Sequence, residues 1–153
     1  VIMNKKQKSL TNKGFSLVEL IIVIAIMAVL VGVLAPQFIK YVEQSRKSTD
    51  IQNAESIKTA VLADIADGTI TGSGDLIEFT GTLNLSATPK TLGASTIAAS
   101  NVPKVQGNLV NHGNNFYVSF NATEGTCKVY PNNATTYDLT NADNANTYKT
   151  TTD

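Results

Sequence analysis

Hydrophobic side chains gather in one long run near the start of the chain. Residues 20–35 are sixteen consecutive positions without a polar side chain. Counted from Phe15 to Pro36, the run makes about 33 Å of helix at a rise of about 1.5 Å per residue. This length crosses the hydrocarbon core of a bilayer, which is about 30 Å thick. The apolar region of a secretory signal peptide has only about 7 to 15 residues, so the pattern predicts a retained membrane helix over residues 15–36.

A second hydrophobic pattern follows and has a helical period. Apolar residues recur at spacings of three, four and one, at Ile51, Ala54, Ile57, Val61, Leu62 and Ile65. Such a stripe is typical of an amphipathic helix with one buried face. Glu43 and Lys47 form a favourable pair four residues apart, and Gly68 suits the position just past a helix end. We therefore expect one helix over residues 15–66, hydrophobic all round in its first half and amphipathic in its second.

Alternating patterns in the rest of the chain predict a small sheet. The clearest signal is a hairpin, because Phe116, Val118 and Phe120 alternate with polar residues before a turn at residues 124–125. Further strands are expected within residues 75–86, 105–110 and 136–139. The polar tail after residue 139 is expected to lie at the surface or to fray. The predicted fold is α+β, with the amphipathic half of the long helix packed on a small antiparallel β-sheet.

Pro36 interrupts the helical pattern. It has no N–H, and its ring collides with the carbonyl group four residues earlier, which belongs to Gly32. A local break of the helix, at least a kink, is therefore expected from Gly32 to Pro36. A static kink without a mechanical role and a zone that can extend are equally good interpretations of these residues.

Charge is distributed unevenly, although it sums to zero over the chain. Four lysines lie within the first fourteen residues, and the remainder carries 8 basic and 12 acidic groups, a net charge of −4. Lysines before an apolar run place that end of the chain in the cytoplasm. An acidic remainder does not favour nucleic acid, which needs a basic face. We expect a single-pass membrane protein whose head has no nucleic-acid partner.

The residues that carry chemistry do not indicate an enzyme. Cys127 is the only cysteine and His112 the only histidine, so neither an intrachain disulfide nor a Cys/His metal set can form. The strand pattern around Cys127 favours a buried thiol. Asp138 and Asp143 lack the regular spacing of a Ca²⁺ loop, although such a site stays an alternative. No catalytic residue, metal or cofactor is predicted.

One acidic residue, Glu19, lies just inside the apolar run. A charge within a membrane helix costs about 2.5 to 3.5 kcal/mol at the helix centre and less near an end. The helix dipole stabilises an acidic side chain near the helix N-terminus by only about 0.3 to 1 kcal/mol. We therefore expect Glu19 to have a cationic partner. The N-terminal lysines are one such partner. Cleavage after Gly14 would provide another, because Phe15 would then carry an α-ammonium group four residues from the carboxylate.

The stretch KGFSLVELIIVIAIMAVLVGVLAP, residues 13–36, resembles the N-terminus of a type IV pilin precursor. The family pattern is a short basic leader ending in glycine, then an aromatic residue or methionine, then an apolar run with glutamate at its fifth position. In this chain Gly14 would end the leader, Phe15 would be the first mature residue and Glu19 the fifth. The resemblance implies cleavage between Gly14 and Phe15 by a prepilin peptidase, which also N-methylates Phe15.

The resemblance further implies a division into a leader (1–14), a membrane and filament-core helix (15–36) and a globular head (37–153). Such a subunit leaves the cytoplasmic membrane through the pilus assembly machinery and polymerises with its own copies into a surface filament. Adhesion, motility or related roles are implied. Glu19 would set the register by meeting the ammonium group of the next copy. In related filaments the zone from Gly32 to Pro36 is extended.

Two alternative functions share these features. A pseudopilin of a type II secretion or DNA-uptake apparatus has the same N-terminal pattern, and a membrane-anchored binding domain that never polymerises would keep its leader. The lone Cys127 departs from the disulfide-closed loop of many Gram-negative pilins. This departure leaves open how the C-terminal segment is held, and it favours a Gram-positive pilin.

Overall fold

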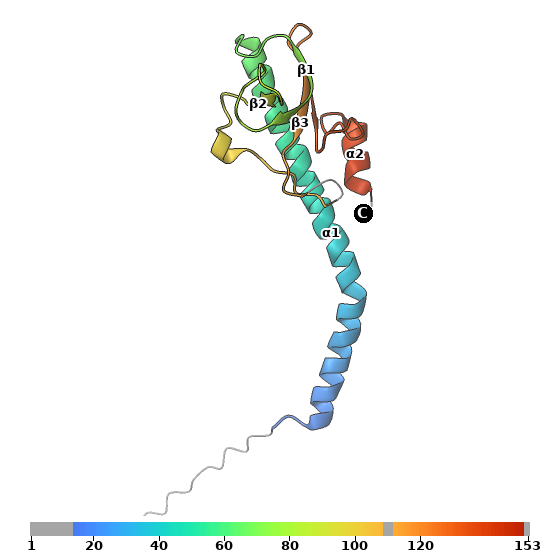
Figure 1. Ribbon diagram of the computed structural model, residues 1–153. Coiled ribbons are helices and arrows are strands. Elements are labelled where there is room, and N and C mark those ends of the chain that lie inside the picture. Colours follow the sequence, from blue (N-terminus) through green and yellow to red (C-terminus); the bar gives the residue numbers. More distant parts are fainter. Residues whose placement is uncertain (1–13, 109–111, 152–153) are drawn as a thin grey trace, which may run out of the picture. The chain divides into compact units, whose positions relative to one another are not determined.

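The computed structural model describes residues 14–108 and 112–151 (Figure 1). In chain order the described residues form α1 (Leu17–Ala66), β1 (Ser73–Phe79), β2 (Thr91–Leu92), the 3-10 helix η1 (Ala99–Asn101), β3 (Tyr117–Asn121), β4 (Thr126–Tyr130) and α2 (Ala142–Thr150). The chain divides into two compact units between Ile39 and Lys40. Apart from Gly14, the predicted leader lies outside the described residues.

The first unit contains the apolar part of α1. The side chains of α1 from Leu17 to Ile39 are all exposed, and an 18-residue window of the helix has a mean hydropathy of 3.1 with none of it buried. By length and composition, α1 is the one helix within the described residues that could cross a membrane. A helix that is apolar all round is stable in lipid or buried among other helices. The apolar N-terminal helix predicted from the sequence is therefore confirmed.

The helix does not end between Gly32 and Pro36, and a kink in this zone stays a prediction. α1 runs from Leu17 to Ala66 as one helix of 50 residues, with Pro36 inside it. Proline still removes one backbone donor, because it has no N–H to give to the carbonyl of Gly32. The turns on either side keep their own hydrogen bonds, so the loss of this bond does not end the helix.

The second unit contains the amphipathic part of α1, whose buried face matches the predicted stripe. Ala54, Ile57 and Val61 are fully buried, and Ile51, Leu62 and Ile65 pack against the same core. Beyond the end of the helix at Ala66, Gly68 has a φ of 84°, a conformation that glycine adopts without steric cost. Its amide donates to the carbonyl of Ile65 at 3.2 Å, which closes the last turn.

The sheet has the strand order β2-β1-β3-β4. β3 and β4 form the predicted antiparallel hairpin, in which Phe120 lies opposite Cys127. β1 is antiparallel to β3, but β2 runs parallel to β1. The sheet is therefore mixed, where an antiparallel one was expected. The reason is that the chain after β1 turns back through an antiparallel bridge between Asn84 and Thr91 and so enters β2 in the direction of β1.

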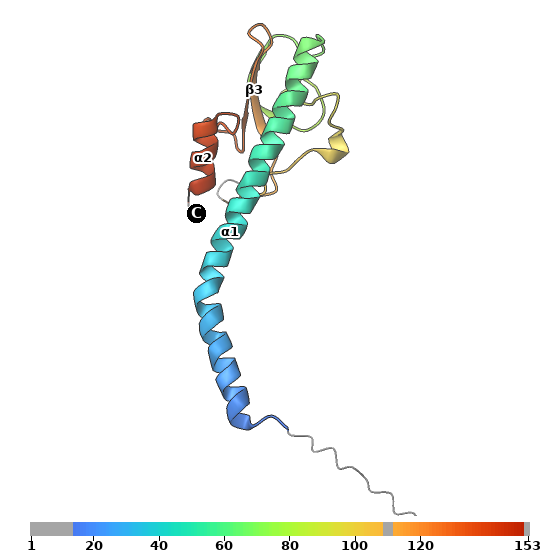
Figure 2. The same ribbon diagram turned by 180° about the vertical axis from the view of Figure 1, so that it is seen from behind.

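One hydrophobic core joins the amphipathic part of α1 to the sheet. Figure 2 shows this part of the helix running along one face of the strands. The core unites buried side chains of helix, strands and connecting segments, among them Ile57, Val61, Phe79, Leu92, Phe116, Val118 and Val129. The predicted α+β fold, with the amphipathic half of the helix on a small sheet, is confirmed.

The C-terminal part of the chain differs from the prediction. Residues 105–108 and 136–139 form no strand, and residues 109–110 lie outside the described residues. The tail, which was expected to lie at the surface or to fray, forms the largely exposed helix α2, whose N-cap residue Asn141 accepts hydrogen bonds from the amides of Asp143 and Asn144. Tyr148 of this helix is fully buried. Tyr148, together with the buried Ala145, docks the tail on the core.

Candidate functional site

The start of α1 is closed by a capping box. Ser16 precedes the helix, and its Oγ accepts a hydrogen bond from the amide of Val18 at 3.3 Å. The Glu19 carboxylate reaches back to the amide of Ser16, with 2.8 Å between Ser16 N and Glu19 Oε2. These bonds satisfy two of the amides that a helix N-terminus leaves without partners. Glu19 thus has a partner in its own chain, which the sequence analysis missed although the S-x-x-E spacing of residues 16–19 signals it.

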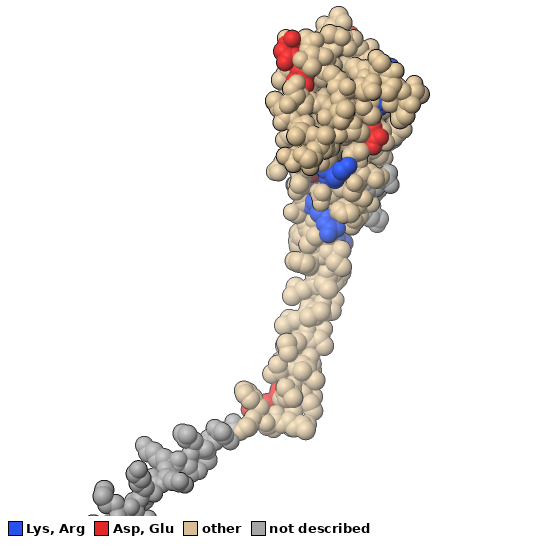
Figure 3. All heavy atoms as spheres, turned by 60° about the vertical axis from the view of Figure 1, so that its left-hand side comes forward, with Lys and Arg blue, Asp and Glu red and all other residues tan. Residues whose placement is uncertain are grey.

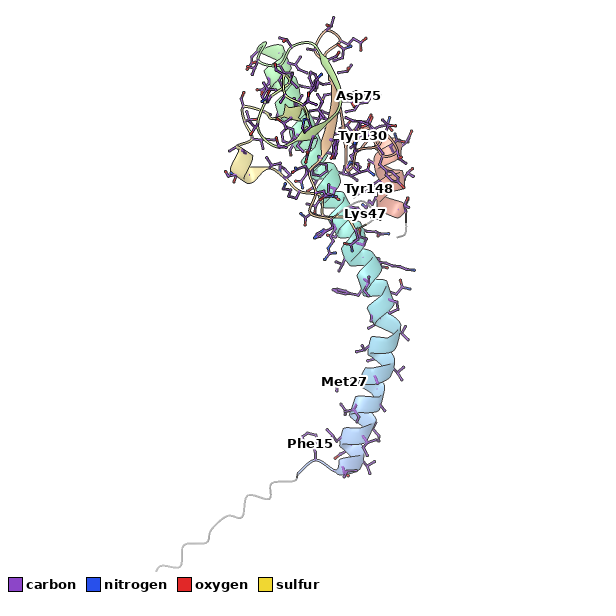
Figure 4. The ribbon with its side chains drawn as sticks, viewed as in Figure 1. Phe15, Met27, Lys47, Asp75, Tyr130 and Tyr148 are labelled. Atoms are coloured by element: carbon purple, nitrogen blue, oxygen red, sulfur yellow. The ribbon has the colours of Figure 1, made fainter. Side chains whose placement is uncertain are left out.

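The surroundings of this carboxylate are apolar. Phe15 is 93% exposed, and together with Leu20, Ile22 and Val23 it lines a hollow of about 450 Å³ that includes Glu19. Figure 4 shows Phe15 beside the start of the helix. Residues 20–39 carry no acidic or basic side chain, and the face seen in Figure 3 shows a long stretch of α1 without red or blue atoms. Burying this surface would therefore bury a single carboxylate with it.

The predicted processing residues lie four and five positions before Glu19 in the sequence. Gly14 and Phe15 precede the helix and are exposed. One oxygen of Glu19 caps the helix, and the other, Oε1, has no hydrogen-bond partner among the described residues. In the uncut chain the nitrogen of Phe15 is a peptide nitrogen. Cleavage after Gly14, N-methylation of Phe15 and the ion pair with Glu19 therefore stay predictions.

We expect Ser16→Ala to loosen the first turn of α1. Loss of an N-cap hydroxyl costs about 1 kcal/mol, which corresponds to about fivefold less protection of the Val18 amide from hydrogen exchange. The measurement is amide exchange on the full chain in detergent micelles. Ser48→Ala is the matched control, because Ser48 Oγ bonds the carbonyl of Gln44 within the same helix. Equal protection of Val18 in both variants would contradict the capping role of Ser16.

A second polar cluster lies in the head and holds the C-terminal helix. Asp50 of α1 is fully buried and accepts three hydrogen bonds, from the amides of Gln106 and Gly107 at 2.7 and 2.8 Å and from the hydroxyl of Tyr148 at 2.8 Å. Burial raises the pKa of Asp50, and the three bonds act in the opposite direction. This carboxylate joins α1, the segment before residue 108 and α2, and so explains how the tail is held without a disulfide.

Lys47 extends this cluster by one turn of the helix. Its Nζ donates to the carbonyl of Thr151 at 2.7 Å and lies 5.6 Å from the ring centroid of Tyr148, a cation–π contact. Figure 4 shows Lys47 and Tyr148 close together. The predicted pair of Glu43 and Lys47 is confirmed, with 4.0 Å between Nζ and Oε1. The same Oε1 accepts the amide of Asn108 at 2.6 Å.

The remaining candidate residues for catalysis or metal binding lie in the head. Cys127 is buried, as predicted, and burial raises the pKa of its thiol to about 12. His112 is exposed, and its Nδ1 lies 2.8 Å from the carbonyl oxygen of Gln106. Asp138 Oδ1 accepts hydrogen bonds from the amide and hydroxyl of Thr140 at 3.0 and 2.6 Å. Within residues 14–108 and 112–151, no three His, Cys, Asp or Glu side chains gather as metal ligands would.

Comparisons with known proteins connect the chain to one group. The prokaryotic N-terminal methylation motif matches residues 10–35. Type IV major fimbrial protein FimA of Dichelobacter nodosus (strain VCS1703A) is 35% identical over 64 residues, 42% of this chain and 40% of that protein. Prepilin peptidase-dependent protein A of Clostridium perfringens (strain 13 / Type A) is 39% identical over 82 residues, 52% of this chain and 58% of that protein. Type IV major pilin protein PilA of Myxococcus xanthus (strain DK1622) is 41% identical over 49 residues, 32% and 22% of the two chains. No solved structure matches the chain significantly.

The chain therefore has the features of one class of protein. An N-terminal methylation motif covers the start of a long apolar helix, and an α+β unit follows this helix. Within this class, the similarity to FimA, PilA and the Clostridium protein confirms the predicted resemblance to a type IV pilin precursor. The chain spans 40% of the length of FimA and 58% of the length of the Clostridium protein.

Proposed function

We propose that this protein is a structural subunit that polymerises into a type IV pilus on the cell surface. The observation that carries the proposal is the start of α1, where Glu19 borders a helix surface that is apolar all round and exposed. Such a helix is stable only in lipid or among other helices. A bundle of copies satisfies this requirement outside the membrane, and the similarity to FimA and PilA supports the same role.

Before assembly, the precursor is a single-pass protein of the cytoplasmic membrane with its N-terminus in the cytoplasm. Prepilin peptidase cuts between Gly14 and Phe15 and methylates the new N-terminus; the methylation motif over residues 10–35 supports this step. Cleavage removes the four lysines of the leader. It also converts the nitrogen of Phe15 from a peptide nitrogen into an α-ammonium group, whose unperturbed pKa is about 7.7 to 8.0.

Assembly then brings this ammonium group to the Glu19 carboxylate of a neighbouring copy. Helices in lipid gain no hydrophobic energy by pairing, so packing and polar contacts must guide them. One oxygen of Glu19 stays on the amide of Ser16, and the other receives the neighbour's cation. An incorrect axial offset would bury the carboxylate and the ammonium group without their counter-charges, and this cost rejects it. Glu19 therefore acts as the register residue of the filament.

The zone from Gly32 to Pro36 is a proposed site of extension in the filament. The carbonyl of Gly32 lacks the donor that residue 36 would otherwise supply. Turns that already miss one hydrogen bond open at lower cost than complete turns. In the single chain this zone is helical, so extension would accompany assembly or load.

The experiment that tests the function combines two measurements on cells that produce the chain. Mass spectrometry of the mature protein should find Phe15 at the N-terminus with one added methyl group. Electron microscopy of sheared surface material should show long filaments composed of this chain. A mature protein that keeps its leader overturns the proposal. Correct processing without long surface filaments would instead indicate the pseudopilin alternative.

We also propose that the protein has no catalytic activity. FimA and PilA are named as fimbrial and pilin proteins rather than as enzymes. The buried carboxylate of Asp50 is engaged by three donors of its own head, and the Cys127 thiol is buried with a raised pKa. Both groups therefore serve the structure of the head.

A further inference from the structure

The outer face of the sheet contains a bulge that changes the path of β1. Gly74 lies opposite Phe120 and Ile77 opposite Val118, so Asp75 and Leu76 share one partner position on β3. Leu76 has a φ of 46° and is the one residue other than glycine with a positive φ among the described residues. A side chain with a Cβ atom disfavours this conformation. Backbone strain of this kind, and bulges that redirect a side chain, concentrate at binding sites.

The bulge brings polar groups of β1 and β3 together. The amide of Leu76 donates to Ser119 Oγ at 3.0 Å, and the hydroxyl of Ser119 donates to the carboxylate of Asp75. Ser119 lies directly opposite Lys128 in the pairing of β3 with β4. Asp75, Ser119 and Lys128 therefore form one row across three neighbouring strands, on the face opposite to Val118 and Phe120, which point into the core.

This row forms part of a shallow hollow of about 500 Å³, lined mainly by polar groups. Lys90, Asn121 and Tyr130 line it together with Asp75 and Lys128. Figure 4 shows Asp75 and Tyr130 at neighbouring positions along the sheet. In the described part of the chain, neither Lys90 nor Lys128 pairs with a carboxylate. Two lysines and one aspartate thus face a hollow of the size that small ligands occupy.

The donors and acceptors restrict the ligand. The two ammonium groups attract an anion, and their excess over the single carboxylate leaves a local charge of about +1. Asp75 repels a simple anion or a phosphate backbone, but its second oxygen accepts hydrogen bonds from hydroxyl groups. A ligand that carries one carboxylate and several hydroxyls satisfies both requirements. Such a ligand is an acidic sugar.

We propose that this hollow binds uronic acid residues of an extracellular polysaccharide, with Lys90 and Lys128 on the sugar carboxylate and Asp75 on its hydroxyls. Ser119 positions Asp75 through its hydrogen bond, and the strained bulge at Leu76 fixes both groups. The site lies wholly in the second unit of the chain. It therefore does not depend on polymerisation, and its test is separate from that of the proposed function.

The test measures binding of digalacturonate and of its neutral counterpart galactobiose to the full chain in detergent, by saturation-transfer NMR and calorimetry. We expect the acidic disaccharide to bind at least about tenfold more tightly than the neutral one, because one charge-assisted contact is worth about that factor. Lys128→Gln and Lys90→Gln should each weaken binding by about tenfold. Lys149→Gln, which changes a lysine of α2 outside the hollow, should leave it unchanged.

Asp75→Asn distinguishes a sugar site from a general anion site. It removes the group that repels simple anions, so acetate should compete with digalacturonate against this variant and fail to compete against the wild type. Equal binding of the two disaccharides, no binding of either, or acetate competition in the wild type would each overturn the proposal. An equal loss in Lys149→Gln and Lys128→Gln would overturn it too. Circular dichroism confirms that each variant is folded.

Discussion

Glu19→Gln should leave the precursor inserted and cleaved but should nearly abolish surface filaments. In the proposed assembly the substitution leaves the ammonium group of Phe15 buried without its counter-charge. Removal of one partner from a buried ion pair costs about 3 to 5 kcal/mol, or about a hundredfold or more in each subunit addition. A filament adds this cost at every subunit, so the effect on length is far larger than on a single contact. Shear-released filament mass, measured by immunoblot and electron microscopy, provides the readout.

Two variants separate the register role of Glu19 from its role in the capping box. Ser16→Ala weakens the cap and keeps the charge, so filaments should form with little loss. Glu55→Gln removes an exposed acid of α1 whose ion pair with Lys58 spans 3.6 Å, and filament mass should stay unchanged because surface pairs contribute little. If Ser16→Ala reduced filaments as strongly as Glu19→Gln, the effect would come from the helix start rather than from an intermolecular pair. Normal filaments in Glu19→Gln would refute the register role.

The features that the sequence predicted are those set by local pattern. The apolar run follows from sixteen consecutive apolar residues, the stripe from Ile51 to Ile65 from a helical period, and the hairpin around Gly125 from alternation and a turn residue. The structure contains all three. The mixed sheet could not be predicted in this way. β2 has only two residues, and its direction depends on how the chain from residue 80 to residue 90 turns back, which no periodicity records.

The polar contacts were harder to predict because their partners are far apart in sequence. Asp50 and Tyr148 are separated by 98 positions, and nothing near Asp50 indicates that an aspartate in a helix will be buried. Tyr148 lies in a segment whose composition favours an exposed tail, yet its ring is buried and its hydroxyl donates to Asp50. The capping box of Ser16 and Glu19 is the opposite case. The S-x-x-E spacing of the capping box can be read from the sequence. The apolar residues around Glu19 instead favoured a cationic partner.

Asp50→Ala should destabilise the head by at least about 3 kcal/mol, since it leaves three donors without an acceptor and each buried unsatisfied group costs about 1 to 3 kcal/mol. This is a large share of the stability of a domain, about 5 to 15 kcal/mol in all. Chemical denaturation of the full chain in detergent measures the loss. Near-ultraviolet circular dichroism is a suitable signal, because the rings of Tyr137 and Tyr148 lie 5.4 Å apart and the hydroxyl of Tyr148 donates to Asp50.

Asp64→Ala is the matched control for this prediction. Asp64 also lies on α1 and is only 3% exposed, but its side chain accepts one hydrogen bond, from the amide of Ser95 at 2.6 Å. Because Asp64→Ala leaves one donor without an acceptor instead of three, it should lower the free energy of unfolding by about 1 to 3 kcal/mol. The dichroism of the tyrosine pair should persist in this variant until global unfolding. Equal costs for the two aspartates would show that the three-donor cluster does not hold α2.

The pH dependence of Asp50→Ala tests the electrostatic state of the cluster. Burial and the neighbouring Glu43 raise the folded-state pKa of Asp50 above its ordinary value of 3.8, against the three hydrogen bonds that lower it. A raised folded pKa means that the native state holds the proton more tightly than the unfolded state, so this contribution to stability is complete below pH 3.8 and declines as pH rises through the folded pKa. The variant lacks the group. The difference in unfolding free energy between wild type and Asp50→Ala should therefore be largest in acid and should decrease towards neutral pH. A difference that grew with pH would mean that the donors outweigh burial and that the buried carboxylate is stabilised in its ionised form.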